Sequence, residues 1–120
     1  MLLSLVILSV AGGLGCAARS LARDFLVRTG MQAWQGILLI NLTGSAALGA
    51  VFASPLGGTA AAACAGFLAG WTTYSAFSVD VVLLWRAGTR WAAIACWSGT
   101  VVGAPLAAWG AHALSGGTWQ

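Results

Sequence analysis

Polar and aromatic side chains are concentrated in one segment of an otherwise apolar sequence, GFLAGWTTYSAFSVD at residues 66–80. Tyr74 and Phe77 lie one helical turn apart and so share a helix face, and the positive edge of an aromatic ring can meet an anion. Hydroxyl side chains accompany them, among them Thr72, Ser75 and Ser78. These residue types at helical spacing favour a polar lane that handles an ion, whereas the alternative is a pair of ordinary core aromatics.

The start of the same segment favours a break in the helix. Gly70, Thr72 and Thr73 together weaken regular helix. Carbonyl groups freed at such a break can ligate a cation, and freed N–H groups favour an anion, provided that both are buried in protein. We therefore predict a break from Ala69 to Thr72 that serves ion handling.

The elements that position this segment must be membrane helices. Of the 120 residues, 60% are hydrophobic and 6% are charged, which excludes an ordinary soluble domain. The 17 glycines allow helices to approach closely in lipid. The net charge of +3 comes from scattered arginines, which do not form the clustered basic face of a nucleic-acid-binding protein.

Breaks in the apolar pattern divide the chain into four predicted spans. No charge interrupts residues 29–79, a run far longer than the roughly 20 residues that cross a bilayer once. Pro55 and the two glycines at 57–58 supply a turn within that run. The sequence predicts an all-α membrane protein, one domain over residues 1–120, with helices at about 2–18, 36–52, 59–85 and 91–114.

The arginines predict one orientation in the membrane. All five lie in the connections between the first two and the last two predicted spans: Arg19, Arg23, Arg28, Arg86 and Arg90. Loops rich in Lys and Arg stay on the cytoplasmic side. We therefore expect a multi-pass protein of the cell membrane with both termini outside.

The segment at 66–80 resembles a known family, the Fluc-type (CrcB) fluoride channels, whose pattern is G-F-x-G-G-x-T-T-F-S-T-F-S-x-E. Two further segments agree with that family. GILLINLTGSAALG at 36–49 resembles its second-helix pattern G-T-x-x-x-N-x-x-G-x-x-x-x-G, and GGLGCAAR at 12–19 resembles the end of its first helix. Motifs in the same order in three spans are much more specific than any single one.

The resemblance implies a fluoride-specific channel subunit, not an enzyme, that exports fluoride passively and so confers fluoride resistance. It implies an antiparallel dual-topology dimer of four-helix subunits with a broken third helix. It also implies a structural, non-transported sodium ion, held here by the backbone carbonyls of Ala69 and Thr72. The fluoride-pathway residues carried over from the family are Arg19, Asn41, Thr73, Tyr74, Ser75, Phe77, Ser78 and Asp80.

The chain departs from the family in its fourth span, which offers only Cys96, Ser98 and Thr100 where relatives carry polar pathway residues. The arginine bias also opposes insertion in both directions. We therefore expect a heterodimer with a homologous subunit of opposite charge bias in preference to a homodimer. The alternatives are a small four-helix drug or cation exporter, which relies on a membrane-embedded acid usually found in the first helix, and a structural subunit without transport.

Overall fold

The computed structural model describes residues 1–117, which form helices joined by short turns. In chain order these are α1 (Leu2–Arg28), α2 (Ala33–Ala53), α3 (Gly58–Trp71), α4 (Ser75–Arg86), α5 (Arg90–Ser98), the π-helical turn η1 (Gly99–Gly103) and α6 (Ala104–Leu114). Four stretches are long and apolar enough to cross a membrane: Leu2–Arg28, Ala33–Ala53, Gly58–Arg86 and Arg90–Leu114. This confirms the predicted all-helical chain with four candidate spans.

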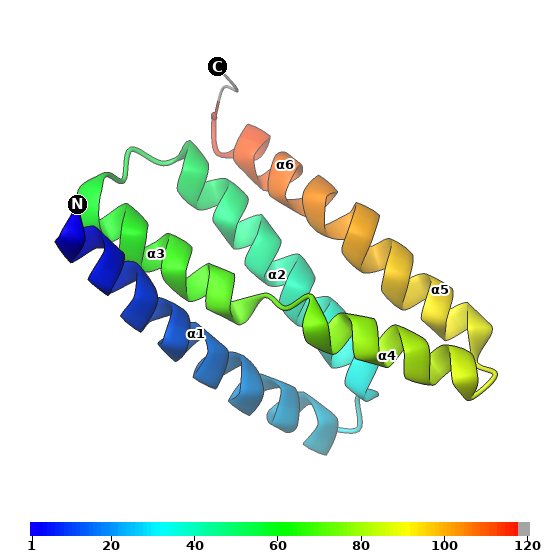
Figure 1. Cartoon of the computed structure of the whole chain (residues 1–120). Coiled ribbons are helices and arrows are strands. Elements are labelled where there is room, and N and C mark those ends of the chain that lie inside the picture. Colours follow the sequence, from blue (N-terminus) through cyan, green and yellow to red (C-terminus); the bar gives the residue numbers. More distant parts are fainter. Residues whose placement is uncertain (118–120) are drawn as a thin grey trace.

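The helices run up and down in one bundle (Figure 1). Its long axis measures 47 Å, close to the roughly 40–45 Å thickness of a bilayer with its headgroups. The α1–α2 and α4–α5 turns lie at the same end, and the α2–α3 connection lies at the opposite end with the start of α1 and the end of α6 (Figure 1). All five arginines therefore lie toward one half of the bundle.

The first helix is longer than predicted. We expected it to end at residue 18, but α1 continues to Arg28 because residues 19–28 contain no glycine or proline that would stop it. Gly30, at φ 96°, terminates it, with N–H bonds from Gly30 to the Val27 carbonyl and from Met31 to the Leu26 carbonyl. Arg19 and Arg23 therefore lie on a helix face and not in a loop.

The second helix is the centre of the bundle, since α2 packs against every other helix. Its buried residues run along its whole length, from Trp34 through Ile37 and Ile40 to Gly49. Trp34 and Ile37 belong to a core cluster with Phe77 of α4 and Ala92 and Cys96 of α5. A polar side chain on the buried face of α2 is thus within reach of the junction between α3 and α4.

Glycines bring α1 and α3 into backbone contact. A Cβ atom added to Gly15 would collide with the Phe67 carbonyl, and one added to Gly70 would collide with the Gly12 carbonyl. Small residues at such crossings let helices associate by close van der Waals packing in lipid. This seam keeps α1 against the end of α3.

Gly15→Ala tests the seam. The added methyl group must push α1 away from α3, and overpacking of this kind costs about 1–3 kcal/mol of stability. The measurement is the midpoint of thermal unfolding in detergent, and the matched control is Gly13→Ala, because a Cβ atom there meets nothing within 4 Å. Equal midpoints for the two variants would contradict the close α1–α3 packing.

Candidate functional site

The side chain of Asn41 bonds to the backbone between α3 and α4, the two helices of the third candidate span. Its Oδ1 accepts the Thr73 backbone N–H at 2.8 Å, and its Nδ2 donates to the Thr73 carbonyl at 3.0 Å. Asn41 is only 3% exposed, so these bonds form away from solvent. In a continuous helix the Thr73 N–H would bond to the Ala69 carbonyl. Asn41 therefore replaces the helical ladder at this residue.

The helical partners of two carbonyl oxygens are diverted at this junction. The Ala69 carbonyl loses the Thr73 N–H to Asn41, and the Ala76 N–H, which would bond to the Thr72 carbonyl, donates to Thr73 Oγ1 at 3.3 Å. The hydroxyl of Thr72 lies 3.4 Å from the Ala69 carbonyl, and Arg19 Nη1 donates to the Thr72 carbonyl at 3.1 Å. Since a carbonyl oxygen has two lone pairs, each keeps acceptor capacity.

These carbonyls fit a cation that takes oxygen ligands, as unwound membrane helices do elsewhere. Ala69 and Thr72 line the same cavity, of about 290 Å³, together with Asn41 and Thr73, and we call it the carbonyl cavity. Within residues 1–117, no three His, Cys, Asp or Glu side chains are grouped so that they could hold a metal. The oxygen ligands that this cavity offers a cation are therefore main-chain carbonyls together with the hydroxyls of Ser45, Thr72 and Thr100.

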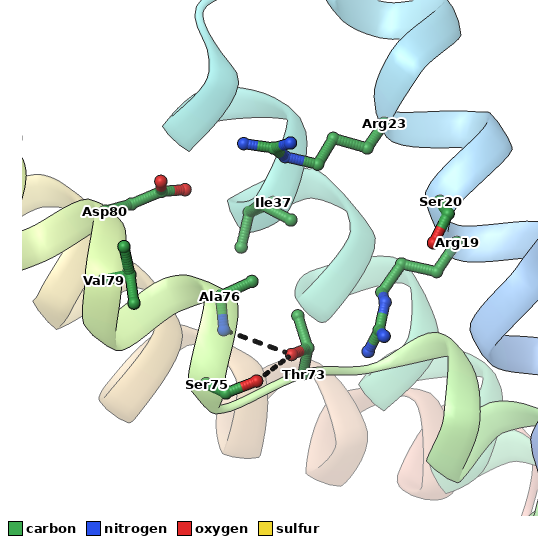
Figure 2. Close-up of a pocket in the computed structure, with 9 residues that line it drawn as sticks. All are labelled: Arg19, Ser20, Arg23, Ile37, Thr73, Ser75, Ala76, Val79 and Asp80. Carbon is green, nitrogen blue, oxygen red and sulfur yellow. Dashed lines mark hydrogen bonds between the residues drawn. The ribbon is translucent and has the colours of Figure 1, made fainter.

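A second cavity, of about 400 Å³, lies between α1 and α4 (Figure 2). We call it the arginine cavity, after Arg19 and Arg23 on its α1 wall. Thr73, Ser75 and Asp80 line the opposite wall, and the hydroxyls of Thr73 and Ser75 lie 3.4 Å apart. Thr73 also lines the carbonyl cavity, so the junction of α3 and α4 separates the two spaces.

The aromatic pair lies on the other side of the junction. Tyr74 and Phe77 meet edge to face with their ring centroids 5.4 Å apart. Phe77 is 3% exposed, whereas Tyr74 is 79% exposed and projects from the bundle. Both line a cavity of about 390 Å³ that extends toward α6, and we call it the aromatic cavity. Ring edges, hydroxyls and released carbonyls therefore surround one break in one membrane span.

The pattern of this chain matches one protein family over most of its length. The family is described as "CrcB-like protein, Camphor Resistance (CrcB)", and it matches residues 6–112. The chain belongs to the CrcB-like family. It is therefore a multi-pass membrane protein, and its family is not one of enzymes.

Curated relatives carry the name "Fluoride-specific ion channel FluC". The protein from Anaeromyxobacter sp. (strain K) is 33% identical over 117 residues, covering 92% of this chain and 93% of its own. The protein from Rhodospirillum centenum is 38% identical over 104 residues, or 75% of this chain and 79% of its own. The protein from Gloeobacter violaceus is 31% identical over 119 residues, covering 89% and 91%.

Most of the residues carried over from the CrcB-like pattern meet around the break. Arg19, Thr73, Ser75 and Asp80 line the arginine cavity, and Asn41, Ala69, Thr72 and Tyr74 line the carbonyl cavity. Ser78 differs from them, since its hydroxyl donates to the Tyr74 carbonyl of its own helix at 2.8 Å.

Among the residues that line this CrcB-like site, Ser45, Thr100 and Arg23 were not in the set of pathway residues carried over from the family. Ser45 lies one turn after Asn41 on the same face of α2, a spacing that would have revealed it. Thr100, on η1, lines the carbonyl and aromatic cavities, and its buried Oγ1 has no hydrogen-bond partner within residues 1–117. Arg23 lines the arginine cavity because α1 continues past residue 18.

Asn41→Ala tests what holds the break. The substitution leaves the buried N–H and carbonyl of Thr73 without their partner, at about 1–3 kcal/mol for each group. The unfolding midpoint in detergent should fall clearly for Asn41→Ala and little for Thr43→Ala, because the Thr43 hydroxyl bonds to carbonyls of its own helix. Trp71 Nε1 also lies 3.5 Å from that hydroxyl, but it keeps its shorter bond, of 3.1 Å, to the Ile40 carbonyl in Thr43→Ala. Similar midpoints for both variants would mean that the Asn41 amide does not support the break.

Proposed function

We propose that this chain is one subunit of a fluoride-specific channel through which fluoride leaves the cytoplasm. The break held by Asn41, with aromatic edges and hydroxyls beside it, is the observation that supports this function. Relatives that match most of the chain carry the fluoride-channel name. Fluoride enters cells as the neutral acid and is trapped inside as the anion. A passive pore driven by the inside-negative potential then suffices for export and resistance.

Dehydration is the physical obstacle that the pathway has to overcome. A small anion that leaves water for a low-dielectric pore loses several kcal/mol unless donors replace its hydration shell. In this proposal the amide of Asn41 and the hydroxyls of Thr73 and Ser75 are among the donors. The ring edges of Tyr74 and Phe77 face the anion with their positive rims. Ser78 and Asp80 follow along α4, and Arg19 lies at the mouth.

The third span acts in this proposal as one membrane helix with a functional break. When sodium is bound, the Ala69 and Thr72 carbonyls supply oxygen ligands to it, and the ion neutralises the carbonyl ends exposed at the end of α3. The diverted helical partners of these two oxygens support the assignment. Arg19 donates to one of the same oxygens, so it shares the task of stabilising the break.

The exporter alternative requires a buried acid in the first helix. α1 does include Asp24, because it is longer than predicted, but that side chain is exposed in the final turns beside Arg28. The buried acid of the spans is Asp80, which is 9% exposed and lies on α4. A structural subunit without transport would not need a helix break that a buried side chain holds in place. Both alternatives are therefore weaker than the channel.

We infer that the working unit is an antiparallel dimer. Tyr74 projects from one subunit although it lies beside the break, so a second subunit packed there would close the aromatic cavity. The arginines lie toward one end of the bundle (Figure 1). This bias favours the cytoplasmic side for that end of the bundle. Both termini then lie outside. The partner is accordingly a homologous subunit of opposite bias.

The orientation of the chain can be tested with a cysteine introduced at Thr29 or at Ser115, with Cys16 and Cys64 replaced by serine and the buried Cys96 retained. These two positions lie at opposite ends of the bundle (Figure 1). In intact cells that express this chain alone, a membrane-impermeant thiol reagent should label Ser115→Cys and spare Thr29→Cys. Equal labelling of both positions, with fluoride flux from the chain alone, would overturn the heterodimer.

Fluoride flux can be tested with a copy of reversed charge bias as the partner. In that copy Arg28, Arg86 and Arg90 become glutamine, and Leu56, Gly57 and Ser115 become arginine. Liposomes that contain both copies should release fluoride, as read by a fluoride-selective electrode, whereas this chain alone should release little. No fluoride release from either preparation would contradict the channel function.

Phe77→Ala in both copies should lower fluoride flux about tenfold, because the ring edge that replaces part of the anion's hydration shell is lost and ring-edge contacts are worth about 0.5–1.5 kcal/mol. Tyr74→Phe should keep flux within about threefold, since the ring edge that meets the anion remains. Unchanged flux in Phe77→Ala would remove the aromatic pair from the pathway.

A further inference from the structure

The arginine cavity contains one charged side chain that the pathway described above does not use, Arg23, opposite one that it does use, Asp80. Arg23 and Asp80 face each other across it, one from α1 and one from α4 (Figure 2). The Nε of Arg23 and the Oδ2 of Asp80 are both buried, and neither has a hydrogen-bond partner within residues 1–117. A buried donor and a buried acceptor of opposite charge thus share one cavity.

The two arginines of the cavity have different surroundings. Arg19 is engaged at the break, where its Nη1 donates to the Thr72 carbonyl at 3.1 Å. Arg23 lies one helical turn further along α1, and its guanidinium extends toward Asp80 (Figure 2). Arg19 therefore serves the break, and Arg23 is left to balance the acid.

Asp80 requires such a balance. It is 9% exposed, and a buried carboxylate without a counter-charge is strongly unfavourable. The cavity of about 400 Å³ also has room for several waters, each of which takes about 30 Å³ of liquid volume. Water between the Arg23 Nε–H and the Asp80 carboxylate would satisfy both buried atoms without direct contact.

We propose that Arg23 is the electrostatic partner of Asp80 and that this water-bridged pair sets the field through which fluoride passes at the cavity. The inference rests on the proposed fluoride channel. With Arg23 present, two guanidinium groups and one carboxylate leave the cavity with an excess of positive charge. Without Arg23, the Asp80 carboxylate opposes Arg19 directly beside the hydroxyls of Thr73 and Ser75, and an anion there is repelled. Arg23 acts through Asp80 and is a positioning residue.

The test is fluoride release from liposomes that contain this chain and its reversed-bias copy, with each substitution in both copies. Arg23→Gln should lower flux about tenfold, because it leaves the buried Asp80 carboxylate without its counter-charge in the cavity. Arg23→Lys should rescue most of the flux, since it returns the charge. The matched control is Asp24→Asn, which removes an exposed charge one residue away and should change flux by less than about twofold.

A double substitution separates pairing from a general effect of charge. In an Asp80→Asn background, Arg23→Gln should lower flux by no more than about threefold, because the carboxylate that it balances is gone. An equal loss in both backgrounds, or wild-type flux in Arg23→Gln, would overturn the pairing.

Failure of the channel proposal gives a different result, namely no fluoride release from the unmodified pair of copies. The pairing is then decided by unfolding midpoints in detergent of four proteins, namely the unmodified chain, Arg23→Gln, Asp80→Asn and the double variant. Arg23→Gln and Asp80→Asn should each lower the midpoint, and the double variant should lose less than the sum of the two. Additive losses would contradict the pair.

Discussion

The structure depends on one buried amide that takes the place of a helical turn. In a bilayer an unsatisfied backbone group costs several kcal/mol, so a membrane helix can be interrupted only where other groups accept and donate in its stead. Asn41 does both for Thr73, with one oxygen and one nitrogen on the same side chain. A single hydroxyl group in its place could not supply the separate acceptor and donor atoms of the planar amide. The break, its diverted carbonyls and the start of α4 all follow from that pair of bonds.

The amide can act only because the helices around it are held in fixed places. Trp71 donates from Nε1 to the Ile40 carbonyl at 3.1 Å, which ties the end of α3 to α2 just before the break. The glycines of α1 and α3 bring their backbones together, and Arg19 reaches Thr72 from the same side. On the far side, a Cβ atom at Gly99 would press on Leu38, so the π-helical turn packs tightly on α2. The break is therefore clamped between α1 and α2.

The spans and most of the site residues could be predicted from residue types. Which side chains face the cavities depended on where each helix ends and how it is rotated in the bundle. The four candidate spans followed from apolar length, because crossing a bilayer requires about 20 residues. Arg23 was placed in a loop because hydropathy falls at Arg19, although residues 19–28 are good helix formers and α1 continues through them. Thr100 was named only as one of three polar residues in the fourth span, and its place beside the break could not be predicted because a π-helical turn changes the angle at which side chains leave the helix. Local composition reveals segments, whereas facing directions depend on tertiary packing.

The extension of α1 changes how the arginine bias should be understood. Arg19 and Arg23 line a cavity inside the bundle, while Arg28, Arg86 and Arg90 lie at helix ends beside the two turns. Lys and Arg residues in short loops and within about 15–20 residues of the span ends all count toward membrane orientation. All five arginines therefore contribute to the bias, but only Arg19 and Arg23 also belong to the site. Since the other three lie outside the site, the bias can be reduced without changing the charges around the break, and the bias and the pathway are partly separable properties of this sequence.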